Sequence, residues 1–147
     1  MTLAEAIRVF GLEPVTDRAV RVAVIDSGVY AAHPHVQGIA GGVSLVAGAD
    51  RADIVDRNGH GTAVAAAIRD KAPGADLLAV KIFDRTLAAT AGDLAEAIEW
   101  AAGQRADLIN LSLGTTNPAH AECLQAALTA AREAGAAVVT AAEQGTL

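Results

Sequence analysis

The sequence is poor in several features that would assign it to a specialised class. Its one cysteine, Cys123, cannot form a disulfide within the chain, which favours a reducing compartment and predicts a cytoplasmic protein. The 11 basic and 17 acidic residues form no clusters, and the net charge of −6 argues against nucleic acid or an anionic membrane as a partner. Apolar stretches are short and interrupted by charge, so none is long enough to span a bilayer. The first residues place acidic Glu5 before any basic residue, unlike a secretory signal.

What the sequence does contain is a regular alternation of short β-branched segments with helical patterns, in a chain of 147 residues that suits one domain. Strands are predicted over 21–29, 41–48, 76–84, 107–114 and 136–142, and helices over 58–70, 90–104 and 117–135. Residues 1–20 are predicted to form an amino-terminal helical extension. This order predicts an α/β fold, with a parallel sheet and helices on both of its faces.

The predicted helix boundaries rest on specific residues. Thr90 and Asp93 have the spacing of a capping box, and Gly103 is expected to end that helix. Asn117 is expected to cap the last helix, with Pro118 in its first turn and a glycine at residue 135 as its terminator. Apolar stripes along these two helices are expected to face the sheet, at Leu94, Ala97, Ile98 and Ala101 and at Leu124, Leu128 and Ala131.

Two side chains with catalytic potential fall where this topology gathers function. Asp26 ends the first predicted strand, and His60 opens a helix in the stretch NGHGTAVAAAIRD. The carboxyl ends of parallel strands and the amino ends of the following helices meet at one edge of such a sheet. A carboxylate on one imidazole nitrogen fixes the tautomer and leaves the other nitrogen free to act as a general base. Each residue alone is more often a turn residue, a cap or a structural hydrogen-bonding group.

The neighbours of the histidine are small. Gly59 and Gly61 allow a close approach of the backbone, and alanines in the helix predict that it runs deep inside the protein, at Ala63, Ala65, Ala66 and Ala67.

Taken in order, these motifs resemble those of the subtilisin-like serine proteases. The resemblance is carried by Asp26 in VAVIDSGV, the HP pair at 33–34, His60 in GHGTAVA, and then APGADLLAVKIFD, INLSLG and VVTAA. It implies a three-layer subtilisin-like fold in which Asp26 orients the general base His60, with no cofactor. It also implies that Ser112, Leu113 and Gly114 pair with an extended peptide substrate, and that Ala142 lies in the wall of a substrate pocket.

The chain departs from this family in its nucleophile. In the subtilisin order the catalytic serine comes last, and no serine follows Ser112; Ser27 and Ser44 precede it. Cys123 is expected to be a packed or half-exposed thiol within a helix. Residues 1–147 are therefore predicted to be a single, partial peptidase domain. A complementary carboxyl-terminal segment would supply the serine and cover the open side of the sheet, or two copies of the chain would associate.

Two further departures concern the oxyanion hole and metals. Where the family has Gly-Asn, this chain has Glu143 and Gln144, so Gln144 is the candidate oxyanion donor on a longer side chain, with a negative charge beside it. His35 stands where relatives carry an aspartate ligand for calcium, and the insertion that completes that site is missing, so calcium is not expected there. The histidine spacing matches no zinc motif.

Two functions from different classes remain open at this stage. The first is a serine endopeptidase that this chain equips with Asp26 and His60, and that is inactive as the isolated chain. The second is a catalytically inactive subtilisin-like module that binds peptides or assembles with a partner. Retention of the aspartate and histidine in their full motifs favours the first, and Glu143 with Gln144 favours the second.

Overall fold

The computed structural model describes residues 18–86, 89–112 and 118–140, and within them a five-stranded parallel sheet forms the centre. The order across the sheet is β2-β3-β1-β4-β5, so the first strand of the chain lies in the middle. The strands span Arg21–Asp26, Gly41–Ser44, Asp76–Lys81, Leu108–Leu111 and Ala137–Thr140 for β1 to β5. β1, β2 and β3 are shorter than their predicted ranges, and the predicted ranges of β4 and β5 extend beyond the described residues.

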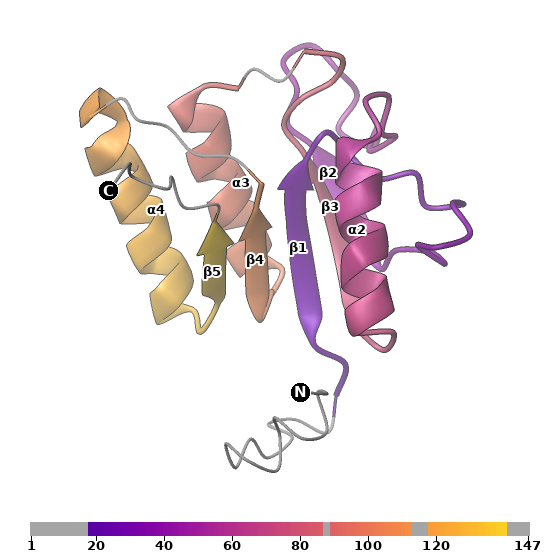
Figure 1. Ribbon diagram of the computed structural model, residues 1–147. Coiled ribbons are helices and arrows are strands. Elements are labelled where there is room, and N and C mark those ends of the chain that lie inside the picture. The colour runs from indigo at the N-terminus through magenta and orange to yellow at the C-terminus, as the bar shows by residue number, and fades with distance from the viewer. Residues whose placement is uncertain (1–17, 87–88, 113–117, 141–147) are drawn as a thin grey trace, which may run out of the picture.

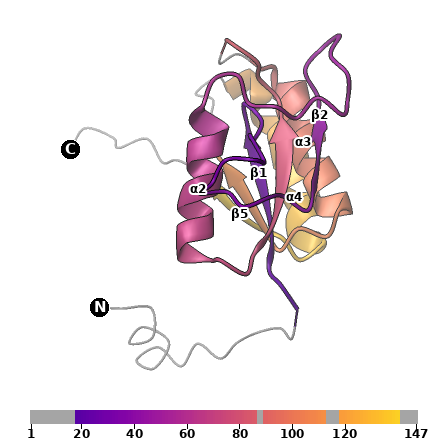
Figure 2. The same ribbon diagram turned by 90° about the vertical axis from the view of Figure 1, so that its right-hand side faces the viewer.

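Helices cover the sheet from both sides, which confirms the predicted fold class. Figure 1 shows the strands side by side with α2 (His60–Lys71) on one side of the sheet. Figure 2 shows α3 (Ala91–Gly103) and α4 (Ala121–Glu133) on the other side. No helix in the described part of the chain is long and apolar enough to cross a membrane.

The hydrophobic core is split by the sheet into two unequal parts. The larger part lies between the sheet and α3 and α4, and all four residues of the predicted α3 stripe are buried there: Leu94, Ala97, Ile98 and Ala101. The α4 stripe also faces this core, with Ala131 fully buried and Leu124 and Leu128 partly buried. The smaller part lies under α2 and the loop after β1, around Val36, Ala65 and Leu77. This asymmetry leaves the α2 side of the sheet more open.

The helix ends confirm most of the predicted signals. Thr90 and Asp93 form the capping box, with the Asp93 amide donating to Thr90 Oγ1 at 3.1 Å and the Thr90 amide to Asp93 Oδ2 at 2.8 Å. Gly135, at φ 90°, ends α4 as predicted. Gly103 is the last residue of α3, as predicted, but the left-handed conformation that follows the helix is adopted by Arg105, with φ 57°. Pro118 opens a short 3₁₀ turn, Pro118–His120, ahead of α4.

Several predicted features lie outside the described residues. These are nearly all of the amino-terminal extension over residues 1–20, the Asn117 cap and the end of the last predicted strand.

An ion pair ties the start of the central strand to the strand beside it. The Arg18 guanidinium donates to both carboxylate oxygens of Asp107, at 2.8 and 2.5 Å, and the Arg21 amide donates to the same carboxylate at 2.8 Å. The hydrogen bond from Arg18, the Arg21 amide and the charges of both arginines hold the pKa of Asp107 below the ordinary value for a carboxyl group, against the opposing effect of burial. The Asp107 carboxylate is thus stabilised in the folded state in its ionised form.

We predict that this ion pair makes stability dependent on acid. A carboxyl group whose pKa is lower in the folded protein stabilises it above the unfolded pKa, about 3.9 for aspartate, and this contribution is lost as the pH falls through the folded pKa. Asp107→Asn should lower the free energy of unfolding at pH 7, and its difference from the wild type should shrink below about pH 4.

Urea unfolding at a series of pH values measures this difference. Glu99→Gln, at an exposed position of α3, removes the same charge and is the matched control. A difference for Asp107→Asn that is constant from pH 3 to pH 7 would contradict the assignment.

Candidate active site

Asp26 and His60 meet at the carboxyl edge of the sheet, as their positions in the sequence predict. Asp26 is the last residue of β1 and its side chain is fully buried, whereas His60 is the first residue of α2 and its side chain is 49% exposed. His60 Nδ1 lies 2.9 Å from Asp26 Oδ1 and 2.8 Å from Asp26 Oδ2. Because a carboxylate only accepts hydrogen bonds, Nδ1 carries the proton that faces Asp26, and Nε2 is the ring nitrogen that can exchange a proton with a substrate or nucleophile.

Backbone geometry allows these two elements to approach so closely. A Cβ on Gly61, the second residue of α2, would lie 2.1 Å from the Gly28 carbonyl oxygen and 3.1 Å from Asp26 Cβ. Gly28 itself has φ +97°, and a Cβ there would lie 2.5 Å from the Ile54 carbonyl oxygen. The helix start is therefore pressed onto the strand end at a distance that only glycine permits.

Asp56 is a residue that the motif analysis did not single out. Its carboxylate accepts hydrogen bonds from the amides of Asn58 and Gly59 and from both the amide and the hydroxyl of Thr62. Burial pushes the pKa of Asp56 upward, but the hydrogen bonds from Thr62, Gly59 and Asn58 outweigh it and leave the pKa below the ordinary value. An aspartate shortly before a helix start is itself a capping signal, and it could have identified this residue.

Ser27 links the two carboxylates. Its amide donates to Asp26 Oδ1 at 2.7 Å, and its hydroxyl lies 2.9 Å from Asp56 Oδ1 and 3.2 Å from Asp26 Oδ1. The amide of Gly61 donates to the same hydroxyl at 3.0 Å. Ser27 is fully buried and engaged in this network, in line with the expectation that it is not the nucleophile.

The loop that carries Asp56 is held by a buried lysine. Lys81, the last residue of β3, is only 1% exposed and donates to the Val55 carbonyl oxygen and to Asp84 Oδ1, both at 2.8 Å. Arg57 donates to Asp53 Oδ2 at 2.8 Å and to Asp84 Oδ1 at 3.3 Å. A hydrogen bond from Lys81 to Val55 and the ion pairs of Arg57 thus fix the residues on both sides of Asp56. The sequence predicts no role for Lys81, because a single lysine at the end of a strand is no motif.

Ser112 is the one predicted substrate-binding residue within the described part. It directly follows β4, whose Leu111 pairs with Ile25, so it lies level with Asp26 at the same edge of the sheet. Its hydroxyl accepts a hydrogen bond from Asn110 Nδ2 at 3.0 Å. The other predicted site residues lie outside the described residues: Leu113, Gly114, Ala142, Glu143 and Gln144.

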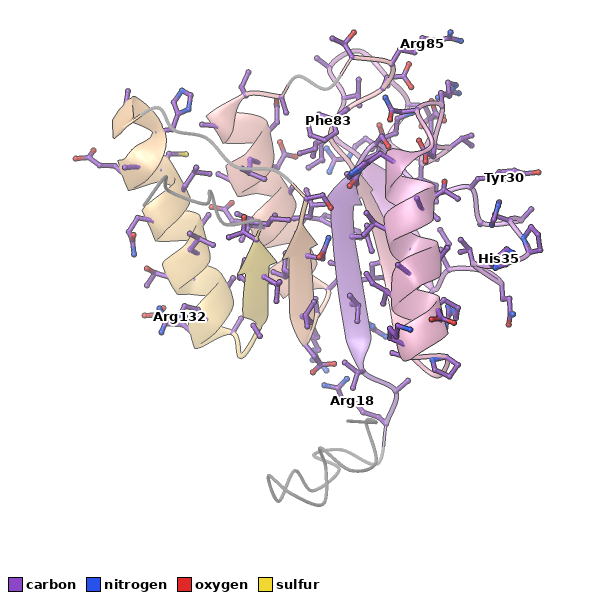
Figure 3. All side chains as sticks on the ribbon, viewed as in Figure 1. Arg18, Tyr30, His35, Phe83, Arg85 and Arg132 are labelled. Carbon is purple, nitrogen blue, oxygen red and sulfur yellow. The ribbon has the colours of Figure 1, made fainter. Side chains whose placement is uncertain are left out.

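The remaining candidates lie away from this edge or form no site. Cys123, expected to be packed or half-exposed, is instead an exposed free thiol in the first turn of α4, on the opposite side of the sheet from α2. The rings of His33 and His35 are 5.5 Å apart, and Figure 3 shows His35 on a loop beside α2. Among the side chains that the structure describes, no three of histidine, cysteine, aspartate or glutamate are grouped so that they could hold a metal ion.

The α2 side of the sheet carries an open apolar groove of about 570 Å³. It lies between α2 and strands β1, β4 and β5, and its lining includes Val20, Val22, Val64, Ala67, Ile68, Leu108, Asn110 and Val139. The prediction that the helix alanines are all deeply buried is wrong for this chain. Ala65 is buried, but Ala63 and Ala67 are exposed. Ala67 is exposed because it faces this groove rather than a packed core.

We predict that Gly61→Ala separates the aspartate from the histidine. The new Cβ meets a carbonyl oxygen of the backbone, which cannot rotate away, so α2 must shift and the free energy of unfolding should fall by about 3 kcal/mol. Thermal unfolding measures the loss, and the NMR signal of the hydrogen-bonded Nδ1 proton of His60 should disappear.

Gly74→Ala is the matched control, since a Cβ at Gly74 has nothing within 4 Å. An Nδ1 proton signal that survives in Gly61→Ala would show that the close approach is not required.

The sequence of this chain is similar to those of known proteins. A family model described as the subtilase family matches residues 17–144. The thermostable alkaline protease of Halalkalibacterium halodurans is 40% identical over 131 residues, which are 83% of this chain and 35% of that protein. Subtilisin Savinase of Lederbergia lenta is 36% identical over 86% of this chain and 48% of its own length. The chain thus spans less than half the length of these curated relatives.

Solved structures agree on the fold. The nisin leader peptidase NisP of Lactococcus lactis superposes with a TM-score of 0.74 and 25% identity, covering 90% of this chain and 46% of that one. A lanthipeptide protease matches with a TM-score of 0.73 over 93% of this chain, at 23% identity. With the family model covering most of the sequence, the chain belongs to the subtilase family.

Proposed function

We propose that this chain supplies the aspartate and the general base of a subtilisin-like serine endopeptidase. The observation that carries the proposal is the pair of contacts between His60 Nδ1 and the buried Asp26 carboxylate, with the exposed part of the imidazole turned to the solvent side. Membership of a family whose curated relatives are named proteases supports it.

In the proposed mechanism, His60 Nε2 takes the proton from a serine hydroxyl as that oxygen attacks the carbonyl carbon of the scissile peptide bond. The Asp26 carboxylate stabilises the imidazolium that forms and keeps the ring in its orientation. His60 then gives the proton to the leaving amine. In the second half of the reaction His60 takes a proton from the water that attacks the acyl-enzyme, and it returns this proton to the serine oxygen as the acid product leaves. The edge at Ser112, which is level with Asp26, is where an extended peptide would pair.

The serine is proposed to come from a complementary carboxyl-terminal segment. The groove beside α2 supports this, because it is lined almost wholly by apolar side chains and Val139 is 50% exposed. A segment with an apolar face that packed into the groove would remove these side chains from water. Asn110 is the polar residue on the sheet side of the groove, and its side chain donates from Nδ2 to Ser112 Oγ. Association of two copies of this chain is the other way to cover the groove.

The proposed cellular compartment is the cytoplasm, supported by the single cysteine. Cell fractionation tests it, and one curated relative, from Bacillus subtilis, is named a minor extracellular protease.

A chimera tests the catalytic proposal. Residues 1–144 are joined to the carboxyl-terminal part of the H. halodurans alkaline protease, which is similar enough for the junction to be placed by alignment. A fluorophosphonate probe should label the chimera, and His60→Ala should abolish labelling and lower peptide turnover by at least about 10⁴-fold, as in other triads. Asp26→Asn should have a similar effect. A folded chimera that hydrolyses peptides equally well with His60→Ala would remove this histidine from the mechanism.

The inactive peptide-binding module is the alternative, and Glu143 with Gln144 is the observation in its favour. A folded chimera that binds peptides without labelling would support it. Labelling that appears only after Glu143→Gly and Gln144→Asn would assign the inactivity to these two side chains.

A charge in the groove should block completion of the domain without harming the isolated chain. Ala67→Glu places a carboxylate on exposed α2 surface in the isolated chain, but in the chimera it would bury that charge without a partner, at a cost of about 3 kcal/mol or more. Thermal unfolding of both proteins measures the contrast.

Ala63→Glu is the matched control, because Ala63 is an exposed alanine of the same helix that does not line the groove. Equal losses for the two variants would show that the covering segment does not pack here.

A further inference from the structure

We propose that Asp56 is a positioning residue for His60, acting through the first turn of α2 and through the hydroxyl of Ser27, which it shares with Asp26. This inference rests on the proposed function, because the reaction that needs the orientation of His60 is the proposed one. Asp56 touches neither the imidazole nor the substrate edge in the described contacts, so its effect passes through other groups.

Asp56 is bound to both elements that deliver the candidate catalytic pair. Its Oδ2 accepts from the amide of Thr62 at 2.9 Å and from the Thr62 hydroxyl at 2.6 Å, so it holds the first turn of α2. Its Oδ1 accepts from the Ser27 hydroxyl at 2.9 Å, and Ser27 directly follows β1. The two ends are thereby tied to one half-buried carboxylate, which links the strand end to the helix start.

The start of α2 depends on this outside support. Its N-cap residue is Gly59, which offers no side chain to the free amides of the first turn. The Gly61 amide instead donates to Ser27 Oγ at 3.0 Å, and the Thr62 amide donates to Asp56. Since His60 is the first residue of this turn, the direction of its ring follows from where these two acceptors hold the backbone.

The Ser27 hydroxyl also sets what Asp26 can accept. A hydroxyl has one proton, so it donates to one carboxylate at a time, and the shorter contact is the one to Asp56. Asp26 Oδ1 is then left with the Ser27 amide and the imidazole, and Oδ2 with the imidazole. If Asp56 ceases to accept, the hydroxyl turns to Asp26 and competes with His60 for the lone pairs of that carboxylate.

The ionised form of Asp56 is secured by its surroundings. The hydrogen bonds from Thr62, Gly59 and Asn58 keep its pKa below the ordinary value in spite of burial. The loop on either side is held by Lys81 and Arg57, so the carboxylate has a fixed place as well as a fixed charge. At neutral pH the acceptor that the proposal requires is therefore present.

The test uses the 147-residue chain, where no nucleophile is needed. Nitrogen-15 NMR of the His60 ring reports which nitrogen carries the proton. Asp56→Asn and Ser27→Ala should each lower the ratio of the Nδ1-protonated to the Nε2-protonated tautomer about fivefold, the scale of one lost hydrogen bond, because each weakens or removes an acceptor that holds an amide of the first turn of α2. Ser27→Thr keeps the hydroxyl and should restore the ratio. Asp50→Asn removes an exposed charge of the preceding loop, where Asp50 accepts the Ala52 amide, and should leave the ratio unchanged.

In the active chimera, the same variants should lower kcat about fivefold with KM unchanged, because substrate binding does not use Asp56. A purely structural cap would lower thermal stability and leave the tautomer ratio as in the wild type, and that result overturns the proposal. If Asp56→Asn fails to fold, the comparison of Ser27→Ala with Ser27→Thr decides the question alone. A changed tautomer ratio in the isolated chain together with an unlabelled chimera would overturn the protease function and leave the positioning role supported.

Discussion

The structure depends on the close approach of one helix start to one strand end. The space above Gly61 is already occupied by the Gly28 carbonyl oxygen, and this contact brings the first residue of α2 within hydrogen-bond distance of the last residue of β1. Every other feature of the site serves this approach. The glycines permit it, the Ser27 hydroxyl and the Asp56 carboxylate bind the amides that it leaves unpaired, and Lys81 fixes the loop from which Asp56 projects.

Withdrawing a carboxylate from water destabilises a fold unless its oxygens accept hydrogen bonds, and buried Asp26 and half-buried Asp56 both have such donors nearby. Asp26 receives the amide of the next residue and the imidazole, and Asp56 receives two loop amides, two groups of Thr62 and the Ser27 hydroxyl. The two acidic residues therefore have different contacts: Asp26 binds the His60 ring, and Asp56 holds the backbone at the start of α2. In Figure 1 this corner lies where β1 ends beside the start of α2.

The two faces of the sheet differ in a way that bears on function. The face under α3 and α4 holds the larger core, whereas the α2 face leaves an apolar groove over β4 and β5. The groove runs along α2 from Val64 to Lys71, the helix that begins with His60, and it is where we propose that the carboxyl-terminal segment packs. In the proposed enzyme, covering this groove would bury apolar area.

The sequence by itself determined the order of strands and helices, the apolar faces of α3 and α4, and the pairing of Asp26 with His60. These follow from local periodicity, from capping residues such as Thr90 and Asp93, and from the rule that parallel strands gather their carboxyl ends at one edge. Only the tertiary structure decided the roles of Asp56, Ser27 and Lys81, the left-handed turn at Arg105 and the exposure of Ala67. Each of these depends on contacts between segments distant in the chain, and no single stretch of sequence records how those segments meet. The burial of Lys81 is the clearest case, since its stabilising partners lie in two separate loops.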